Sequence, residues 1–187
     1  MGFHTFDSDR ADKLEDAATR YRYCSREELH ALLAPDPGMR VADLGSGTGF
    51  YTDDLAPHVG TAYAVDVQAE MHDRYREKGV PDGVELVEAD AADLPFGDGE
   101  LDAAVSTMTF HEFADPEAMA EVARVLRPGG RLVTVDWDRA GAGEAGPPRE
   151  ETYALGDAVA LQTDAGFAIE RAASRPETFV CVARLDD

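Results

Sequence analysis

The chain has 187 residues, and its 38 acidic and 17 basic side chains give it a formal net charge of −21 at pH 7. This length is sufficient for a single domain with a substantial hydrophobic core. No apolar run approaches the roughly 20 residues that a membrane-spanning helix needs, and the first 20 residues lack the apolar core of a signal peptide. We therefore expect a cytoplasmic protein without a membrane span.

The acidic side chains are spread along the whole sequence, and only two lysines occur, Lys13 and Lys78. Such a charge would destabilise a compact fold by self-repulsion unless it were screened. Concentrated salt provides that screening, because the Debye length falls to roughly 3 Å at 1 M. The pattern favours a halophilic protein, with an acidic surface for a basic partner as the alternative. Nucleic acid is an unlikely partner, since the sequence has no basic stripe.

Residues 3–36 are predicted to be helical, with apolar side chains such as Leu14 and Tyr21 recurring at helical spacing. A second helix in this segment is predicted to begin with a capping box at Ser25 and Glu28. The sequence PDPG at 35–38 then ends the helical region.

Short apolar stretches then alternate with helical ones. Strands alternating with helices predict one α/β sheet of parallel strands that is covered on both faces. The strand-like stretches are MRVADL (39–44), TAYAVDV (61–67), VELVEAD (84–90), LDAAVSTM (101–108) and, after the turn RPGG, RLVTVDW (131–137).

The end of the chain departs from this alternation. A Gly/Pro/Ala-rich loop at 138–151 precedes a helical stretch at 152–166. The β-prone stretches 167–174 and 178–185 are separated by a short turn, which predicts a terminal hairpin. The last strand is therefore expected to run antiparallel to its neighbours.

Three glycines at alternate positions, Gly45, Gly47 and Gly49, follow the first strand and precede a helix. A strand, a glycine-rich turn and a helix N-terminus together form a site for a polar or anionic ligand at the carboxyl end of a sheet. A dinucleotide-binding protein would instead have a small residue where Phe50 stands and a parallel final strand. Neither expectation holds here.

The stretch VADLGSGTG (41–49) resembles motif I of the class I S-adenosylmethionine (SAM)-dependent methyltransferases. Further matches follow in order: AVDV at 64–67, EADAADLPF at 88–96, and 101–137 with its LRPGG turn. The chain looks most similar to the small-molecule branch related to ubiquinone/menaquinone C-methyltransferases (methyltransferase type 11-like). This resemblance covers residues 38–184.

The resemblance implies a Rossmann-like seven-stranded sheet that is mostly parallel, with an antiparallel last strand. It also implies one methyltransferase domain over residues 1–187, in which a short helical cap (1–36) precedes a SAM-binding core (38–184). We expect a monomer or a homodimer.

The resemblance also assigns roles to residues of the cofactor site. Asp66 would accept hydrogen bonds from the ribose hydroxyls, Asp90 would bind the adenine amino group, and Ala91 would contact the ring through its backbone. Asp43 carries a charge suited to the cofactor's ammonium group, although it could instead cap the glycine turn, and Asp66 and Asp90 could likewise be a solvated acid and a turn residue. The complete set expected to bind the cofactor is Asp43, Gly45, Ser46, Gly47, Gly49, Asp66, Val67, Asp90, Ala91 and Ser106.

Methyl transfer from a sulfonium is an in-line displacement that needs alignment and exclusion of water. No metal site is predicted, because neither the five histidines nor Cys24 and Cys181 show metal-ligand spacing. In the segment after the fourth strand, Thr107, Met108 and His111 are expected to face the methyl group.

His111 is the candidate general base in that segment, and its alternative role is packing beside neighbouring phenylalanines. Tyr21 and Tyr23 could close over the sulfonium or pack in the core. The predicted function is SAM-dependent methyl transfer to a small-molecule acceptor, with S-adenosylhomocysteine (SAH) as product. The alternative is a non-catalytic SAM/SAH-binding protein that acts as a sensor or partner subunit.

Overall fold

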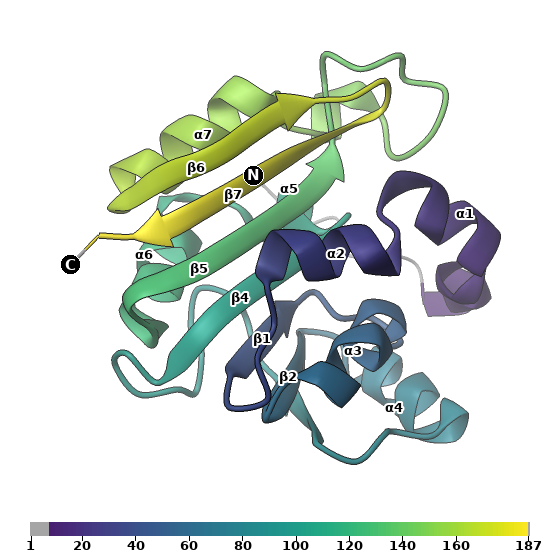
Figure 1. The fold of residues 1–187 in the computed structure, drawn as a ribbon. Helices are drawn as coiled ribbons and strands as arrows, with labels where there is room; N and C mark the ends of the chain where they lie inside the picture. Colours follow the sequence, from purple (N-terminus) through teal and green to yellow (C-terminus); the bar gives the residue numbers. More distant parts are fainter. Residues whose placement is uncertain (1–7, 187) are drawn as a thin grey trace.

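The computed structural model describes residues 8–186, which form a seven-stranded sheet of order β3-β2-β1-β4-β5-β7-β6 (Figure 1). Strand β7 is antiparallel to both of its neighbours, and the other pairings between adjacent strands are parallel. This arrangement confirms the predicted fold, including the terminal hairpin. The strands are β1 (Arg40–Leu44), β2 (Thr61–Asp66), β3 (Val84–Glu88), β4 (Leu101–Thr107), β5 (Leu126–Trp137), β6 (Phe167–Ser174) and β7 (Thr178–Leu185).

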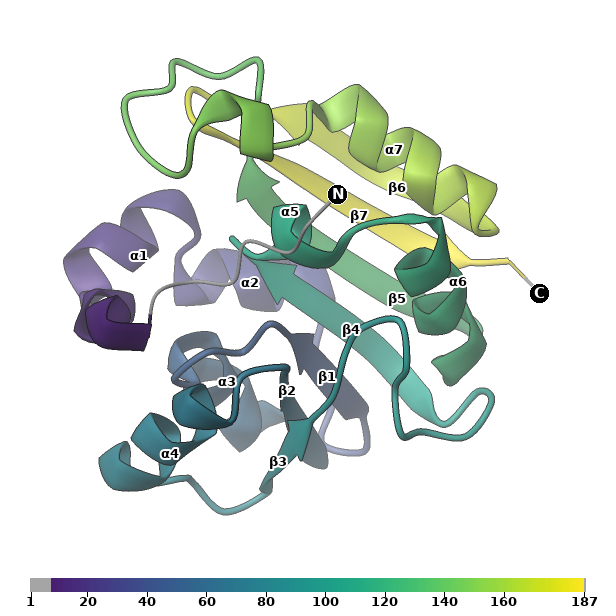
Figure 2. The ribbon, with the colours of Figure 1, turned by 180° about the vertical axis from the view of Figure 1, so that it is seen from behind.

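Helices cover both faces of the sheet (Figures 1 and 2). Helices α2 and α3 pack on one face and α6 and α7 on the other, because successive side chains of each strand point to opposite sides. The α-helices are α1 (Ala17–Tyr23), α2 (Arg26–Leu33), α3 (Phe50–Leu55), α4 (Ala69–Lys78), α5 (Phe110–Phe113), α6 (Pro116–Val125) and α7 (Leu155–Asp164). The 3-10 helices are η1 (Ser8–Glu15), η2 (Ala56–His58) and η3 (Arg149–Glu151).

The parallel register brings the carboxyl ends of five strands, β1–β5, to one edge of the sheet. Leu44 of β1 is paired with Val65 of β2, and Asp66 is paired with Glu88 of β3. The chain leaves the sheet there into the glycine turn and into the turn after β4. Ligand sites of open α/β sheets lie at this edge.

The helical cap consists of three short helices, η1, α1 and α2; residues 3–7 of the predicted helical region lie outside the described residues. Ser25 caps α2 as predicted, because its hydroxyl accepts the Glu28 N–H at 3.2 Å. The Glu28 carboxylate accepts a hydrogen bond from Arg175 and so ties the cap to the β6–β7 turn. The predicted RPGG turn lies within the first residues of β5, where the β4–β5 register shifts.

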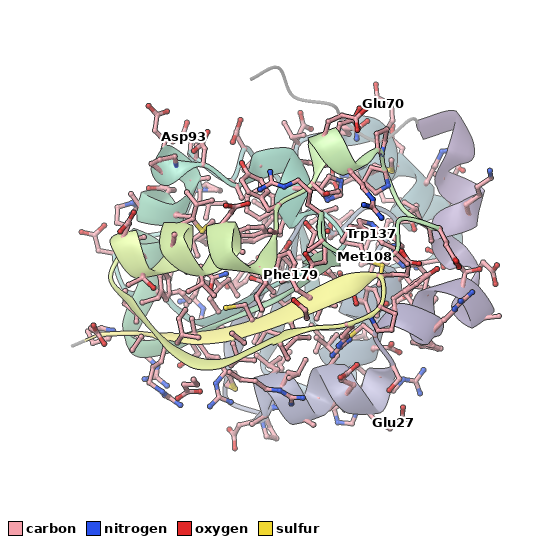
Figure 3. All side chains as sticks on the ribbon, turned by 90° about the horizontal axis from the view of Figure 1, so that it is seen from above. Glu27, Glu70, Asp93, Met108, Trp137 and Phe179 are labelled. Carbon is pink, nitrogen blue, oxygen red and sulfur yellow. The ribbon has the colours of Figure 1, made fainter. Side chains whose placement is uncertain are left out.

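Several acidic side chains lie at the margin of the molecule, while others, such as Asp43 and Asp136, are buried. Figure 3 shows Glu27, Glu70 and Asp93 pointing outwards, with Phe179 and Met108 towards the middle. Within residues 8–186, each helix is too short or too polar to span a bilayer.

Candidate functional site

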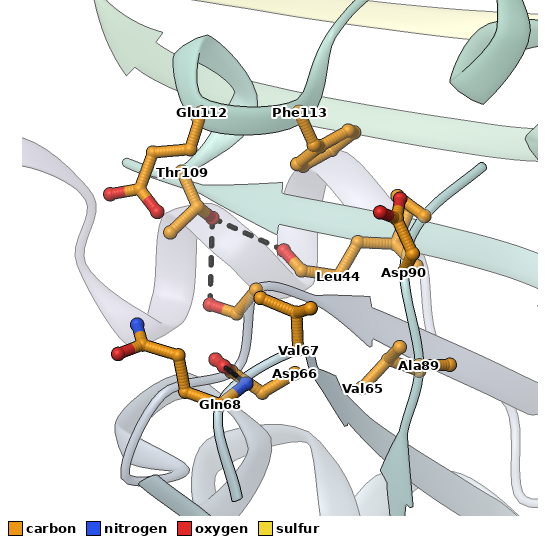
Figure 4. A pocket seen from close by; sticks show the side chains of 12 residues that line it. Leu44, Val65, Asp66, Val67, Gln68, Ala89, Asp90, Thr109, Glu112 and Phe113 are labelled. Carbon is orange, nitrogen blue, oxygen red and sulfur yellow. Dashed lines mark hydrogen bonds between the residues drawn. The ribbon is translucent and has the colours of Figure 1, made fainter. Parts of the chain in front are cut away.

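Two adjoining pockets lie at the carboxyl edge of the sheet, with about 470 and 430 Å³ of free space. We call them the strand-end pocket, beside the ends of β1–β3 (Figure 4), and the cap pocket, beneath η1 and α1. The residues that line both pockets are Gly45, Asp66, Gln68, Thr109 and Glu112. The strand-end pocket is completed by Leu44, Val65, Val67, Ala89, Asp90, Ala91 and Phe113, and the cap pocket by Leu14, Arg20, Ser46, Gly47, Thr48, Phe50, Met71 and Met108.

The glycine turn is packed closely on its protein side. Gly45 has φ +72°, and a Cβ there would lie 2.7 Å from the Thr109 side chain. Gly49 has φ +82°, and its Cβ would lie 2.1 Å from the ring of Tyr75. Both positions therefore require glycine for conformation and for close packing. The space beside Gly49 is occupied by Tyr75, a contact that the sequence did not indicate.

Asp66 ends β2 and fixes the shape of the turn. Its carboxylate accepts the Gly47 N–H at 2.8 Å and the Gln68 N–H at 2.9 Å. Burial raises the pKa of Asp66 although these two bonds favour its charged form. Each oxygen has a further lone pair, so the carboxylate can also accept hydrogen bonds from hydroxyl groups of a ligand.

The far wall of the strand-end pocket contains three other residues of the predicted cofactor set. Val67 is 47% exposed, unusually high for a large apolar residue. Asp90 accepts the Ala92 N–H at 2.9 Å, and Ala91 is buried beside it. Together with Phe113 (Figure 4), they give this pocket an apolar wall with one carboxylate, suited to a flat heteroaromatic ring with an amino group.

Two residues that line the cap pocket have a buried polar atom without a hydrogen-bond partner among the described residues, Arg20 Nε and Ser46 Oγ. A third such atom, Asp43 Oδ1, lies beneath the glycine turn. The Arg20 guanidinium lies 4.8 Å from the ring centroid of Tyr51 and 5.8 Å from that of Phe50. Buried polar groups are usually paired. Two unpaired atoms at one pocket, with an unpaired carboxylate oxygen beneath its glycine turn, indicate a ligand that carries both charges.

Asp43 lies beneath the glycine turn and does not line either pocket. Its Oδ2 accepts the Thr52 hydroxyl at 2.6 Å. Burial raises the pKa of Asp43 to about 6, against the opposing effects of Thr52 and the positive charge of Arg20.

After β4, His111 and Glu112 differ in their surroundings. His111 Nδ1 lies 2.9 and 3.0 Å from the two carboxylate oxygens of Asp136, and its backbone N–H donates to the same carboxylate at 2.6 Å. Burial alone would lower the pKa of His111, but Asp136 outweighs it and the pKa is raised. Burial raises the pKa of Glu112 to about 7. Glu112 lines both pockets, whereas His111 lines neither.

The remaining predicted residues occupy different places. Ser106 and Thr107 are buried at the end of β4 and do not line either pocket, whereas Met108 lines the cap pocket with φ +62°. Tyr21 stands behind Phe50 and donates to Asp54 at 2.8 Å. Tyr23 packs edge-on against Trp137.

Arg20, Gln68, Glu112 and Phe113 were missed from the sequence. Of these four, Arg20 could have been found from the sequence, because it directly precedes the tyrosines that we singled out. The described residues contain no cluster of three or more potential metal ligands, and Cys24 and Cys181 are both buried and unpaired.

Comparison with known proteins agrees with this geometry. A family model for a methyltransferase domain matches residues 42–134. The structure of a SAM-dependent methyltransferase from Aquifex aeolicus superposes with a TM-score of 0.87 and 30% identity, over 97% of this chain and all of that one. The demethylmenaquinone methyltransferase of Corynebacterium kroppenstedtii is 35% identical over 120 residues, which are 64% of this chain and 49% of that protein. The chain thus spans about half the length of this curated relative.

The cyclase SpnF also shares the fold, with a TM-score of 0.75 and 20% identity over 99% of this chain and 86% of that one. At that identity the likeness concerns the fold alone. The Aquifex protein, by contrast, is covered in full at 30% identity. The chain therefore belongs to the family of SAM-dependent methyltransferases.

Proposed function

We propose that the chain binds SAM across the two pockets and transfers its methyl group to a small-molecule acceptor. The observation that carries this proposal is the pair of unpaired atoms of Arg20 and Ser46 at a pocket that Asp66 shares, with the unpaired oxygen of Asp43 beneath the adjoining glycine turn. A ligand with a carboxylate, an ammonium group and a pair of vicinal hydroxyls would satisfy them all. The amino-acid and ribose parts of SAM have these groups.

In this arrangement the adenosine part occupies the strand-end pocket and the methionine part the cap pocket. Asp66 binds the ribose, Asp90 the adenine amino group, and Val67 and Phe113 flank the ring. Arg20 binds the methionine carboxylate, and the ammonium group is placed towards Asp43 and the glycine turn. When bound, SAM supplies the activated methyl group, while this chain's residues align the acceptor and exclude water.

A small acceptor is supported by the size of the cap. Residues 8–36 place only three short helices above the site, too little structure to recognise a large acceptor. Similarity to a demethylmenaquinone methyltransferase supports the same class. We retain the acidic surface as evidence for a halophilic protein, and a monomer or homodimer as its expected state.

The test is a calorimetric titration of SAM, SAH and NADH in multimolar KCl, with the Asp66→Ala variant and the matched control Asp73→Ala, an exposed aspartate of α4. We expect micromolar binding of the two adenosyl ligands, no binding of NADH, and loss of binding in Asp66→Ala alone. No binding of SAM or SAH would refute the proposal. Binding without turnover on any acceptor would favour the sensor function.

A further inference from the structure

Glu112 occupies a position that the cofactor assignments leave unexplained. It lines both pockets, on the wall opposite Asp66 and Gln68 (Figure 4). Its carboxylate accepts no hydrogen bond from the described residues, and the nearest ionisable contact is His111 Nε2, 3.9 Å from Oε1. A half-buried carboxylate without a donor is costly, so its place at the junction indicates a use there.

The junction of the pockets locates the reacting group. If adenosine fills one pocket and methionine the other, the sulfonium that links them lies where the two pockets meet. Asp66, the other carboxylate at the junction, already accepts two backbone N–H groups. Glu112 is thus the free carboxylate nearest to where the methyl group leaves.

His111 lines neither pocket and is poorly placed to accept the acceptor's proton, but its Nε2 lies within ion-pair distance of the Glu112 carboxylate. Its Nδ1 is bonded to Asp136, a fully buried carboxylate that also accepts the His111 N–H. These bonds fix the imidazole with Nε2 towards Glu112. The arrangement follows the orienting logic of a carboxylate–imidazole pair.

We propose that Glu112 receives the acceptor's proton during methyl transfer, that His111 and Asp136 position it, and that the acceptor is a neutral or cationic compound with an N–H or O–H nucleophile. This inference rests on the proposed function. An anionic acceptor would face both Asp66 and Glu112 and is disfavoured by their charge.

The step balances in atoms and charge. The acceptor's lone pair forms the new bond to the methyl carbon while the carbon–sulfur bond breaks, and its electron pair remains on sulfur. The acceptor's N–H or O–H bond gives its proton to the Glu112 carboxylate. The cationic sulfonium and the anionic carboxylate thereby become a neutral thioether and a neutral acid together.

Three charged groups act on Glu112: His111 on the same helix, α5, Asp66 at the end of β2, and Asp136 on β5. Burial raises the Glu112 pKa to about 7; protonated His111 lowers it, and the two aspartates raise it. Glu151 of η3 in turn helps to raise the His111 pKa. A base with a pKa near neutrality suits proton transfer at physiological pH.

The inference can be tested without knowing the acceptor. Sinefungin is a SAM analogue that carries an amine in place of the S-methyl group, so its ammonium lies where the methyl group would be, whereas SAH has no charge there. We would measure protons released on binding each ligand at pH 7, by calorimetry in two buffers of different ionisation enthalpy. A cation beside Glu112 expels its proton, so sinefungin should release about half a proton more than SAH, given the pKa of about 7.

Variants assign this difference to particular residues. Glu112→Gln should abolish it, and Glu117→Gln, an exposed neighbour on α6, should leave it unchanged. His111→Asn should move its pH midpoint upwards, because a protonated imidazole no longer lowers the Glu112 pKa; a purely structural role would leave the midpoint in place. On amine or hydroxyl acceptors, Glu112→Gln should lower kcat by about 10²–10⁴-fold with little change in KM for SAM.

The outcomes separate this inference from the proposed function. Binding of both ligands with equal proton release, or a difference that persists in Glu112→Gln, would overturn the inference alone. If neither ligand binds, the proposed function is overturned as well. Unchanged turnover of an amine or hydroxyl acceptor in Glu112→Gln would also refute the role of Glu112.

Discussion

The proposed arrangement of the cofactor can be tested at a single side chain, that of Arg20. Its guanidinium is held against Tyr51 and Phe50, its Nε has no partner among the described residues, and it borders the cap pocket. We replace it with methionine, which retains much of the apolar stem but cannot bind a carboxylate. A hydrogen bond to a charged group contributes about 1.5–3 kcal/mol, so the Kd for SAH should rise roughly 10- to 150-fold.

The matched ligand is 5′-methylthioadenosine, which has the adenosine and sulfur but no amino-acid group. The Arg20→Met variant should bind it as the wild type does, because the strand-end pocket is untouched. Arg22→Met is the matched variant: Arg22 is exposed on the same helix, lines neither pocket, and should change neither affinity. Both ligands are titrated calorimetrically against all three proteins.

An equal loss of affinity for both ligands in Arg20→Met would refute the reasoning, since it would show that the cap had moved. Unchanged SAH affinity would refute it as well. Folding is checked separately, because Arg20 also lowers the pKa of buried Asp43. The affinity is therefore compared only where the melting curve of the variant shows a folded protein.

Three further predictions concern stability. Gly49→Ala should destabilise the protein by about 2–5 kcal/mol in urea titrations, from its left-handed conformation and its clash with Tyr75; Gly156→Ala, where a Cβ meets nothing within 4 Å, should not, and equal behaviour would contradict this packing. Because the folded pKa of Asp43, about 6, exceeds its ordinary value, the folded state binds the extra proton, and this group's contribution to stability falls as pH rises from about 4 to 6. Between pH 5 and 7.5 the wild type should lose about 1 kcal/mol of its free energy of unfolding through this group, and the Asp43→Asn variant should not show that loss. Parallel pH profiles of the two proteins would contradict this prediction. Thermal melts should show a higher Tm in multimolar KCl than in low KCl. Greater stability at low salt would contradict the halophilic interpretation.

Much of the fold could be predicted because its signals are local. Each buried strand is a short apolar run, and the turn at 175–177 between two β-prone stretches determined the antiparallel ending of the sheet. The bounds of the first helices were harder to predict, because the periodicity around Leu14 and Tyr21 does not show where one short helix ends and the next begins. The RPGG segment was assigned to a turn because glycine and proline predict turns more strongly than they predict an irregular strand start.

The residues of the candidate site likewise fall into two groups, those that a local sequence pattern predicts and those that it does not. Gly45, Asp66, Val67 and Asp90 lie at strand ends, so their common location follows from the parallel sheet alone. Arg20 and Glu112 reach the same space from a cap helix and a four-residue helix, and their side-chain directions depend on tertiary packing that no local pattern encodes. His111 illustrates the consequence: its residue type favours a base, but Asp136 lies 25 residues further along the chain and only the fold brings it to the imidazole.

This division matters for function, because the residues that the sequence predicts and those that it does not are proposed to have different roles. In the proposed arrangement the strand-end residues bind the adenosine part of the cofactor, so they point to SAM without indicating a reaction. SpnF shares the fold and is a cyclase, which shows that the sheet and its edge do not determine the chemistry. In the proposed arrangement, the groups that distinguish one acceptor from another are those above the sulfonium: Glu112, Met108 and the residues of the cap. A search for the acceptor should therefore begin with neutral or cationic N–H and O–H compounds.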